Sequence, residues 1–172
     1  MPDDPASGEN DLDSNGGRPS PEASGAASTW TPSVREHEGR REILDPVRRQ
    51  WVALTPEEGV RQRLIALLFS LGYPAGLLAV EKKVEHLGRL WRADVVAYDR
   101  RQRPILLAEC KAPGLAIAQA TFDQLARYNA VLGAQVLLAT NGDALRCCTQ
   151  DASGLWRWVG TVPAFADVDG KP

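Results

Sequence analysis

The sequence predicts an α/β fold in which a central mixed sheet of four to five strands is flanked by helices. Three observations predict it: two segments with helical spacing of apolar residues, at 55–71 and 117–132, several apolar runs bounded by turn residues, and one run, 104–111, that is apolar on both faces. In chain order these segments give helix, three strands, helix and two strands. A length of 172 residues with 44% hydrophobic content suits a single soluble domain.

The first helix has clear start and stop signals. Thr55 is a typical N-cap, Pro56 suits the first helical position, and Glu58 completes a capping box. Gly72 marks the end of the helix. Between these signals the apolar residues recur at helical spacing: Val60, Leu64, Leu67, Leu68 and Leu71.

Three strands are predicted next. Residues 77–86 and 90–98 form a hairpin through the short turn 87–89, which contains Gly88. Residues 99–103 form the following turn. The doubly apolar run 104–111 is expected at the centre of the sheet.

The second half of the domain repeats the alternation of helix and strand. An amphipathic helix is predicted for 117–132, and Gly133 ends it. Strands are expected at 135–139 and 144–149, on either side of the turn 141–143. The apolar stripe of the helix consists of Phe122, Leu125, Tyr128 and Leu132.

The two ends of the chain differ from the middle. Residues 1–40 are rich in Pro, Gly, Ser and acidic residues, and we expect a disordered acidic tail. We expect the domain itself at 41–160 and a loose C-terminal tail at 161–172. Residues 1–29 hold six acidic residues against one base, so the remainder carries a charge of +3. This mildly basic body is compatible with a nucleic-acid partner but does not require one.

Several classes of protein are disfavoured. No apolar stretch approaches the length of a membrane helix and the N-terminus does not resemble a signal peptide, so we expect a cytoplasmic protein without a membrane partner. Three cysteines, Cys110, Cys147 and Cys148, are an odd number, and the two histidines do not stand at zinc-finger spacing. Buried apolar thiols are therefore expected.

Charged residues interrupt the predicted buried strands. Glu109 and Lys111 share one face of the central strand, and Asp94 interrupts the strand before it. Burying such ions costs several kcal/mol unless they are paired or bind something. Asp94 and Glu109 could hold Mg²⁺, with Lys111 orienting the attacking water or neutralising charge on a phosphoryl group.

A purely structural role for these ions is the alternative. The sequence contains a second Glu-x-Lys pair, Glu81 and Lys83, which a solvated strand face explains better. A structural ion pair between Asp94 and Lys111 is the competing interpretation of the first pair. If Asp94 and Glu109 repel each other with no metal between them, Asp94→Asn is expected to melt at or above the wild-type temperature.

The next helix adds Gln124 and Tyr128, four residues apart and so on one face. Asp94, Glu109-x-Lys111 and Gln124-x-x-x-Tyr128 together resemble the PD-(D/E)xK nuclease superfamily, in its RecB-like branch. The surrounding sequence, over about residues 43–150, is similar to the N-terminal domain of type I restriction enzyme R subunits. The supporting stretches are residues 55–62, 71–73, 92–95, 107–113, 124–128 and 140–142.

The resemblance implies a restriction-endonuclease-like core and Mg²⁺-dependent cleavage of DNA phosphodiester bonds, with Mn²⁺ as a substitute ion. It implies that Asp94 and Glu109 bind the metal, that Lys111 acts at the attacking water, and that Gln124 and Tyr128 support the site or contact DNA. DNA and a separate motor or specificity protein are the implied partners. The other function considered is a non-catalytic nucleic-acid-binding or assembly module that keeps the nuclease fold.

In this family a glutamate on the first helix often completes the site. Glu57 and Glu58 are the candidates, and helical phase favours Glu57 because it falls near the axis of the apolar stripe. Two departures limit the resemblance. Ala93 stands where the superfamily name has Pro, and the sequence lacks the GxxxxGK[ST] loop of a motor.

Two further groups of residues were weighed as nucleic-acid contacts. Tryptophans can stack on bases, although packing is their more frequent use. Arginines beside the first helix could reach phosphates, although a solvated basic face is favoured. The tryptophans are Trp30, Trp51, Trp91, Trp156 and Trp158, and the arginines are Arg40, Arg41, Arg48 and Arg49.

Overall fold

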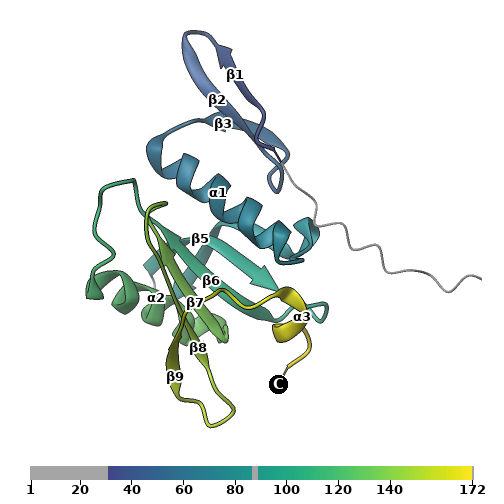
Figure 1. Ribbon diagram of the computed structural model, residues 1–172, viewed down its shortest axis with the longest axis vertical. Helices are drawn as coiled ribbons and strands as arrows, with labels where there is room; N and C mark the ends of the chain where they lie inside the picture. Colours follow the sequence, from purple (N-terminus) through teal and green to yellow (C-terminus); the bar gives the residue numbers. More distant parts are fainter. Residues whose placement is uncertain (1–30, 87–88, 172) are drawn as a thin grey trace, which may run out of the picture.

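The computed structural model describes residues 31–86 and 89–171. In Figure 1 the smaller sheet lies at the top, and the helix α1 lies between it and the larger sheet, which extends to the bottom of the view. The helix α2 covers the face of the larger sheet opposite α1. The elements in chain order are β1(Val34–His37), β2(Arg40–Asp45), β3(Gln50–Ala53), α1(Pro56–Ser70), the short 3-10 helix η1(Ala75–Leu77), β4(Leu78–His86), β5(Arg89–Tyr98), β6(Pro104–Cys110), α2(Gln119–Leu132), β7(Val136–Thr140), β8(Leu145–Gln150), β9(Trp156–Val159) and α3(Phe165–Val168).

The larger sheet has six strands in the order β4-β5-β6-β7-β8-β9. The pair β6 and β7 is parallel and the other neighbours are antiparallel. The predicted mixed α/β architecture with a central β6 is therefore confirmed. The sheet exceeds the predicted four to five strands because β9, with its polar and exposed residues, carries little apolar signal.

The helix α1 begins as the sequence predicts. Thr55 Oγ1 accepts a hydrogen bond from the Glu58 backbone N–H at 3.1 Å, and Pro56 is the first helical residue. The Glu58 carboxylate does not complete the capping box by accepting from the Thr55 backbone N–H. It pairs with Arg48 and Arg61 instead. The helix consequently buries a polar face as well as its apolar stripe.

The helix α2 also forms where the sequence predicts it, two residues later than the expected start. Leu125 and Tyr128 of its apolar stripe are buried, and Phe122 and Leu132 pack beside them. Gly133 ends the helix with φ of 69°, a left-handed conformation that glycine adopts without steric cost.

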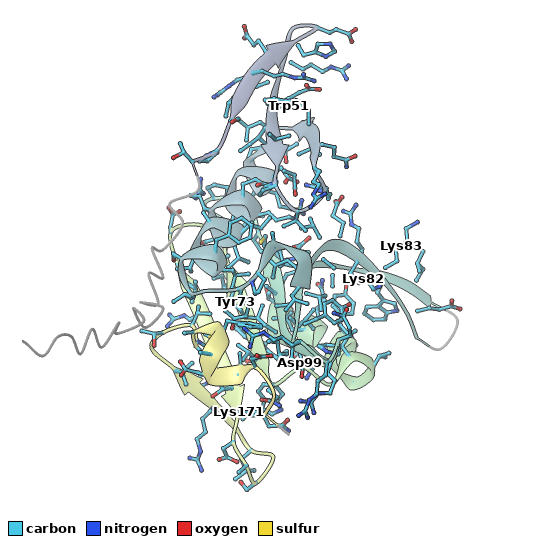
Figure 2. All side chains as sticks on the ribbon, turned by 90° about the vertical axis from the view of Figure 1, so that its right-hand side faces the viewer. Trp51, Tyr73, Lys82, Lys83, Asp99 and Lys171 are labelled. Carbon is cyan, nitrogen blue, oxygen red and sulfur yellow. The ribbon has the colours of Figure 1, made fainter. Side chains whose placement is uncertain are left out.

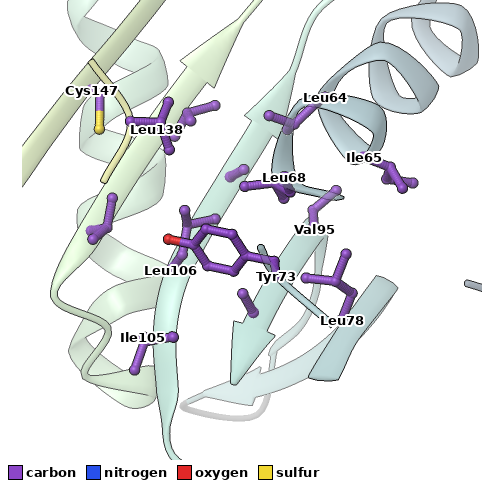
Figure 3. Packing of buried hydrophobic residues seen from close by; sticks show 14 of the residues in the cluster. Leu64, Ile65, Leu68, Tyr73, Leu78, Val95, Ile105, Leu106, Leu138 and Cys147 are labelled. Carbon is purple, nitrogen blue, oxygen red and sulfur yellow. The ribbon is translucent and has the colours of Figure 1, made fainter. Parts of the chain in front are cut away.

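The two faces of the six-stranded sheet carry separate apolar clusters. On the α1 face, Leu64 and Leu68 pack on Val95, Leu106 and other residues of the central strands (Figure 3). On the α2 face, Leu125 packs in a second cluster with strand residues such as Leu107. The central strand is thus covered on both sides, which holds its C-terminal end in a fixed place.

The predicted boundary of the N-terminal tail at residue 40 is wrong. Strands β1, β2 and β3 form a three-stranded antiparallel sheet against α1, and β1 starts at Val34. The β1–β2 turn places Glu38 and Gly39 at positive φ, and Arg35 pairs with Glu42 across the strands at 2.7 Å. Composition missed β1 because all four of its residues are exposed and three of them are polar or charged. Residues 1–30 of the predicted tail lie outside the described residues.

The predicted C-terminal tail is also wrong for most of its length. Val162, Phe165 and Val168 are buried, and the rings of Phe165 and Tyr73 meet edge to face with centroids 5.4 Å apart. Tyr73 Oη donates a hydrogen bond to the Pro163 carbonyl oxygen at 3.0 Å. Three apolar residues spaced three apart are enough to dock this segment, although they are too few to give a helical pattern.

The cysteines are placed as the sequence predicts. Cys110, Cys147 and Cys148 are free and buried, as the sequence predicts. Burial raises the pKa of the Cys147 thiol to about 12. Within residues 31–86 and 89–171 no helix has the length and apolar character needed to cross a bilayer.

Candidate active site

The site begins at the C-terminal end of β6, where the ladder with β7 continues to the last residue. Cys110 pairs with Thr140, and the Lys111 backbone N–H donates to the Thr140 carbonyl oxygen at 2.8 Å. This pairing fixes the backbone on both sides of Glu109. The Glu109 side chain is 8% exposed and that of Lys111 is 28% exposed, so the carboxylate is buried and the ammonium reaches the surface.

Asp94 lies where both of its neighbouring ladders are interrupted. The β5–β6 ladder ends at the pair Val95 and Ala108, and the β4–β5 register passes over Glu81 and Asp94. Ala93 and Val95, two positions apart, pack in the clusters on opposite faces of the sheet. The alternation of side chains between the two faces of the sheet is therefore interrupted at Asp94. Its carboxylate is not confined to either face.

The freed carboxylate of Asp94 replaces a ladder partner. Its Oδ2 accepts a hydrogen bond from the Cys110 backbone N–H at 2.6 Å, the amide next to Glu109. Asp94 and Glu109 are thereby tied to adjacent positions of two strands. The sequence-based prediction that these carboxylates converge is consistent with this geometry, and Asp94 acts on the charge state of Glu109.

Glu109 is held by two donors on one of its oxygens. Lys111 Nζ lies 2.7 Å and Gln124 Nε2 lies 2.9 Å from Glu109 Oε1. Gln124 Nε2 also donates to Tyr128 Oη at 3.0 Å, one helical turn along α2. The second oxygen, Glu109 Oε2, is buried and has no hydrogen-bond partner among the described residues. The structure thus brings together Asp94, Glu109, Lys111, Gln124 and Tyr128.

Burial and charge shift the pKa values at this cluster. Burial raises the pKa of Glu109, and the negative charge of Asp94 raises it further. Burial alone would lower the pKa of Lys111, but its hydrogen bond and charge contact with Glu109 outweigh that effect and raise it. Burial, followed by the charge of Glu109, raises the pKa of Tyr128. The site therefore holds a charged lysine beside a carboxylate whose ionisation is opposed.

The buried arginine Arg61 is a member of the site that the sequence analysis missed. Its side chain is 3% exposed, and its Nη2 lies 2.9 Å from Asp94 Oδ1 and 3.2 Å from Glu57 Oε1. Its Nη1 pairs with Glu58. The nearby carboxylates raise the pKa of Arg61 against the opposing effect of burial. The two glutamates three and four residues earlier on the helix were the available signal.

A second arginine, Arg48, extends this ion network away from the site. It lies 2.8 Å from Asp45 Oδ2, 2.6 Å from Glu58 Oε1 and 2.7 Å from Glu81 Oε2. The sequence favours a solvated face for Arg48 and for Glu81, and both predictions are wrong because the two side chains pair with each other and are only 15% and 29% exposed. Lys82 and Lys83 of the second Glu-x-Lys segment are exposed as predicted, and both point away from the molecule in Figure 2.

The two candidate glutamates of α1 occupy different places. Glu58 is buried and faces Arg48, whereas the Glu57 side chain is 44% exposed and shares the Arg61 Nη2 group with Asp94. Helical phase assigned the buried position to Glu57, and this is wrong, because the polar face of α1 packs against β2 through the Arg48 network. Glu57 nevertheless contributes to the charge around Lys111.

The donor set suits a hard divalent cation with a small number of protein ligands. Mg²⁺ usually takes one or two carboxylates and keeps several waters. Asp94 and Glu109 offer carboxylate oxygens only, and Glu109 Oε2 is a buried oxygen without a partner. Within the described part of the chain no cluster of three or more His, Cys, Asp or Glu side chains has metal-binding geometry. Two carboxylates with water ligands are therefore the arrangement that these residues fit.

The chain is similar to a known protein family and to a solved structure. The family described as "Type I restriction enzyme R protein N terminus" matches residues 56–160. A solved fragment assigned as an HsdR subunit of a type I restriction enzyme from Vibrio vulnificus YJ016 has 18% sequence identity and a TM-score of 0.50. The alignment covers 67% of this chain and 24% of the fragment, so the chain spans about a quarter of that structure and shares its fold. No curated protein matches the chain.

Proposed function

Since the chain belongs to the family of type I restriction enzyme R protein N termini, we propose that it is a metal-dependent nuclease domain. It hydrolyses phosphodiester bonds of nucleic acid, with DNA as the expected substrate and Mg²⁺, or Mn²⁺ in its place, as the ion. The single observation that carries the proposal is the buried, unpartnered Glu109 Oε2 beside Asp94. A buried hydrogen-bond acceptor without a partner is costly, and binding of a cation to that oxygen removes the cost.

Asp94 and Glu109 are the residues that would hold the ion. A bound Mg²⁺ supplies a water of lowered pKa and neutralises charge on a phosphoryl oxygen. On the chain itself, Gln124 and Lys111 fix Glu109 through Oε1 and leave Oε2 for that ligand. This division of the two oxygens keeps the carboxylate oriented without using both of them.

Lys111 is the group proposed to act on the substrate. Its ammonium is anchored to Glu109 at 2.7 Å yet 28% exposed, so it can reach a phosphoryl group without losing its tether. Its raised pKa keeps the ammonium charged, and a cation here stabilises the negative charge that grows on the phosphate. Tyr128 and Gln124 are proposed to support this arrangement, and Glu57 to complete the acidic group through Arg61.

The partners follow from the same family. The fragment it resembles is described as a subunit of a type I restriction enzyme and is about four times as long as the matched part. We therefore propose that a separate motor or specificity protein acts with this domain on DNA. The isolated chain is expected to cleave DNA less readily than the chain together with that partner.

The test is a cleavage assay on supercoiled plasmid, single-stranded DNA and RNA with Mg²⁺, Mn²⁺ or EDTA. Wild type is expected to cut with either metal and not in EDTA. Lys111→Ala is expected to lose most of the activity, on the order of a hundredfold or more, because it removes charge stabilisation in the transition state. Lys83→Ala is the matched control, since it removes an exposed lysine from the second Glu-x-Lys segment.

Two outcomes contradict the proposal. If Lys83→Ala and Lys111→Ala cut equally well, the activity does not belong to this site. If wild type cuts no nucleic acid with either metal, alone or with a motor protein, the non-catalytic binding or assembly module holds instead.

A further inference from the structure

Two of the tryptophans are exposed on one edge of the molecule. Trp156 and Trp158 lie on β9, the edge strand of the six-stranded sheet, and are 40% and 63% exposed. Residues two apart on a strand share a face and lie about 6.6 Å apart along it. Trp91, by contrast, packs on Tyr128 with ring centroids 4.9 Å apart. The β9 pair therefore forms an aromatic stripe that remains exposed.

Trp158 forms one wall of a groove beside the start of α2. Its ring packs edge to face on the ring of Phe122 at a centroid distance of 4.7 Å, and this contact fixes the orientation of the Trp158 ring. The groove has a volume of about 440 Å³, and Ile117, Phe122, Arg146 and Trp158 are among its lining residues. An aromatic ring fixed by a neighbour is a pre-organised stacking surface.

The strand register connects this groove to the candidate active site. Glu109 pairs with Ala139 across β6 and β7, and Ala139 pairs with Arg146 across β7 and β8. Register partners point to the same face, so Arg146 lies on the face of Glu109 two strands away, at about 10 Å between backbones. Trp158 pairs with Cys148, two residues after Arg146, and so shares that face. Glu109, Arg146 and Trp158 therefore follow one another across the sheet.

Arg146 brings a free positive charge to this row. Its side chain is exposed, and within the described residues no carboxylate lies within ion-pair distance of it. Arg157 of β9, which pairs with Thr149 in the strand register, instead forms an ion pair with Asp151 at 2.7 Å. An unpaired guanidinium between an aromatic stripe and a carboxylate cluster favours an anionic ligand with flat rings.

We propose that this groove binds a single strand of nucleic acid, with a base stacked on Trp158 and a phosphate at Arg146, and leads that strand to Glu109 and Lys111. The inference rests on the proposed nuclease function and deepens it, because it assigns the substrate as a single-stranded or melted segment. In a duplex the faces of the bases are already stacked, whereas a single strand presents them to an aromatic side chain.

The experiment measures binding without cleavage. Fluorescently labelled oligo(dT) is titrated with the full chain in EDTA, and anisotropy gives the Kd at several salt concentrations. Trp158→Ala is expected to weaken binding roughly 5- to 100-fold, whereas Trp158→Phe retains a stacking ring and stays within a few-fold of wild type. Arg146→Ala is expected to weaken binding and to flatten the salt dependence by about 0.7 in the logarithmic slope, the value for one phosphate on a single strand.

Two variants serve as matched controls. Leu155→Ala removes an exposed apolar side chain from the β8–β9 turn, and Arg101→Ala removes an exposed arginine from the turn that precedes β6, at the other end of that strand. Both are expected to bind oligo(dT) as wild type does. Thermal melts of all variants confirm that each is folded at the assay temperature.

The inference is overturned if Trp158→Ala and Arg146→Ala bind oligo(dT) like the controls, or if a duplex of equal length binds more tightly than the single strand and depends equally on Trp158. Binding through the groove by a wild type that never cuts with Mg²⁺ supports the groove and removes the nuclease. Cutting by a wild type whose groove variants bind normally supports the nuclease and removes the groove.

Discussion

Replacing Glu109 by Gln tests the state of the site in the absence of metal. Glu109 Oε1 accepts from Lys111 and Gln124, and a glutamine amide oxygen can accept both bonds. The amide nitrogen then takes the place of Oε2, which has no partner. The substitution therefore removes the charge and keeps the packing and the two hydrogen bonds.

The magnitude follows from two opposing terms. Burial and the charge of Asp94 raise the pKa of Glu109 above its ordinary value of 4.5, and each unit of such a shift opposes folding by about 1.4 kcal/mol once the group ionises. The ion pair with Lys111 is lost, but that side chain is 28% exposed, so the pair contributes about 0–1 kcal/mol. Because the pKa of Glu109 is raised even though Lys111 and Gln124 lower it, the net effect of ionisation opposes folding, and the variant is expected to be at least as stable as wild type at pH 7.

The pH dependence has a defined sign. A carboxyl group with a raised pKa contributes stability that is fully present below the unfolded pKa of about 4.5 and is lost as the pH rises through the folded pKa. Glu109→Gln lacks this loss. Its advantage over wild type is therefore expected to be absent below about pH 4.5, to grow as the pH rises through the folded pKa, and to stay constant above it.

The assay is urea denaturation in EDTA at several pH values, followed by circular dichroism. Asp94→Asn is the comparison, because Cys110 N–H and Arg61 both donate to Asp94 and an amide group opposes one of them. It is expected to lose about 1–3 kcal/mol. If Glu109→Gln instead loses 3–5 kcal/mol at every pH, Glu109 is a structural counter-ion of Lys111 and the metal site is refuted.

Two further predictions concern the parts of the fold that the sequence did not reveal. Phe165→Ala is expected to destabilise the protein by about 3–5 kcal/mol in the same denaturation assay, because the buried ring packs on Tyr73, while the exposed Leu155→Ala changes stability by less than about 0.5 kcal/mol. Arg48→Ala is expected to cost about 3 kcal/mol, because it leaves the fully buried Asp45 without its cation, and the exposed Arg40→Ala is its control. An equal effect of a variant and its control would contradict the docking of α3 or the role of the Arg48 network.

The central fold could be predicted because its signals are local. Thr55 and Gly133 mark helix ends by backbone chemistry, and the doubly apolar run of β6 belongs in the middle of a sheet whatever surrounds it. Strand β1 and helix α3 give weak local signals, since all residues of β1 are exposed and α3 is held by a few apolar contacts. Such elements are specified by the surface they pack on.

The candidate site could be predicted in its residues but not in its ion pairing. Spacing alone selects Glu109 with Lys111 and Gln124 with Tyr128, because period two and period four each define one face. The contact of Arg61 with Asp94 depends on how α1 crosses a strand 33 residues later, which no local pattern encodes. For that reason the sequence predicts relief of repulsion in Asp94→Asn, and the structure replaces this with a loss of hydrogen bonds.

The two carboxylates of the site consequently differ in what holds them. Asp94 has a fixed partner on each oxygen, a backbone amide on Oδ2 and a guanidinium on Oδ1, so its position does not depend on a metal. Glu109 has both donors on one oxygen and none on the other. A cation bound between these carboxylates would supply a partner only to Glu109, because Asp94 already has one on each oxygen. The gain in stability on binding Mg²⁺ should therefore depend on the charge of Glu109. This gain is about 2.7 kcal/mol at a hundredfold excess of Mg²⁺ over Kd. In the proposed metal site, Asp94 would then be the fixed ligand that sets the position of the ion, and Glu109 the ligand that makes its binding favourable.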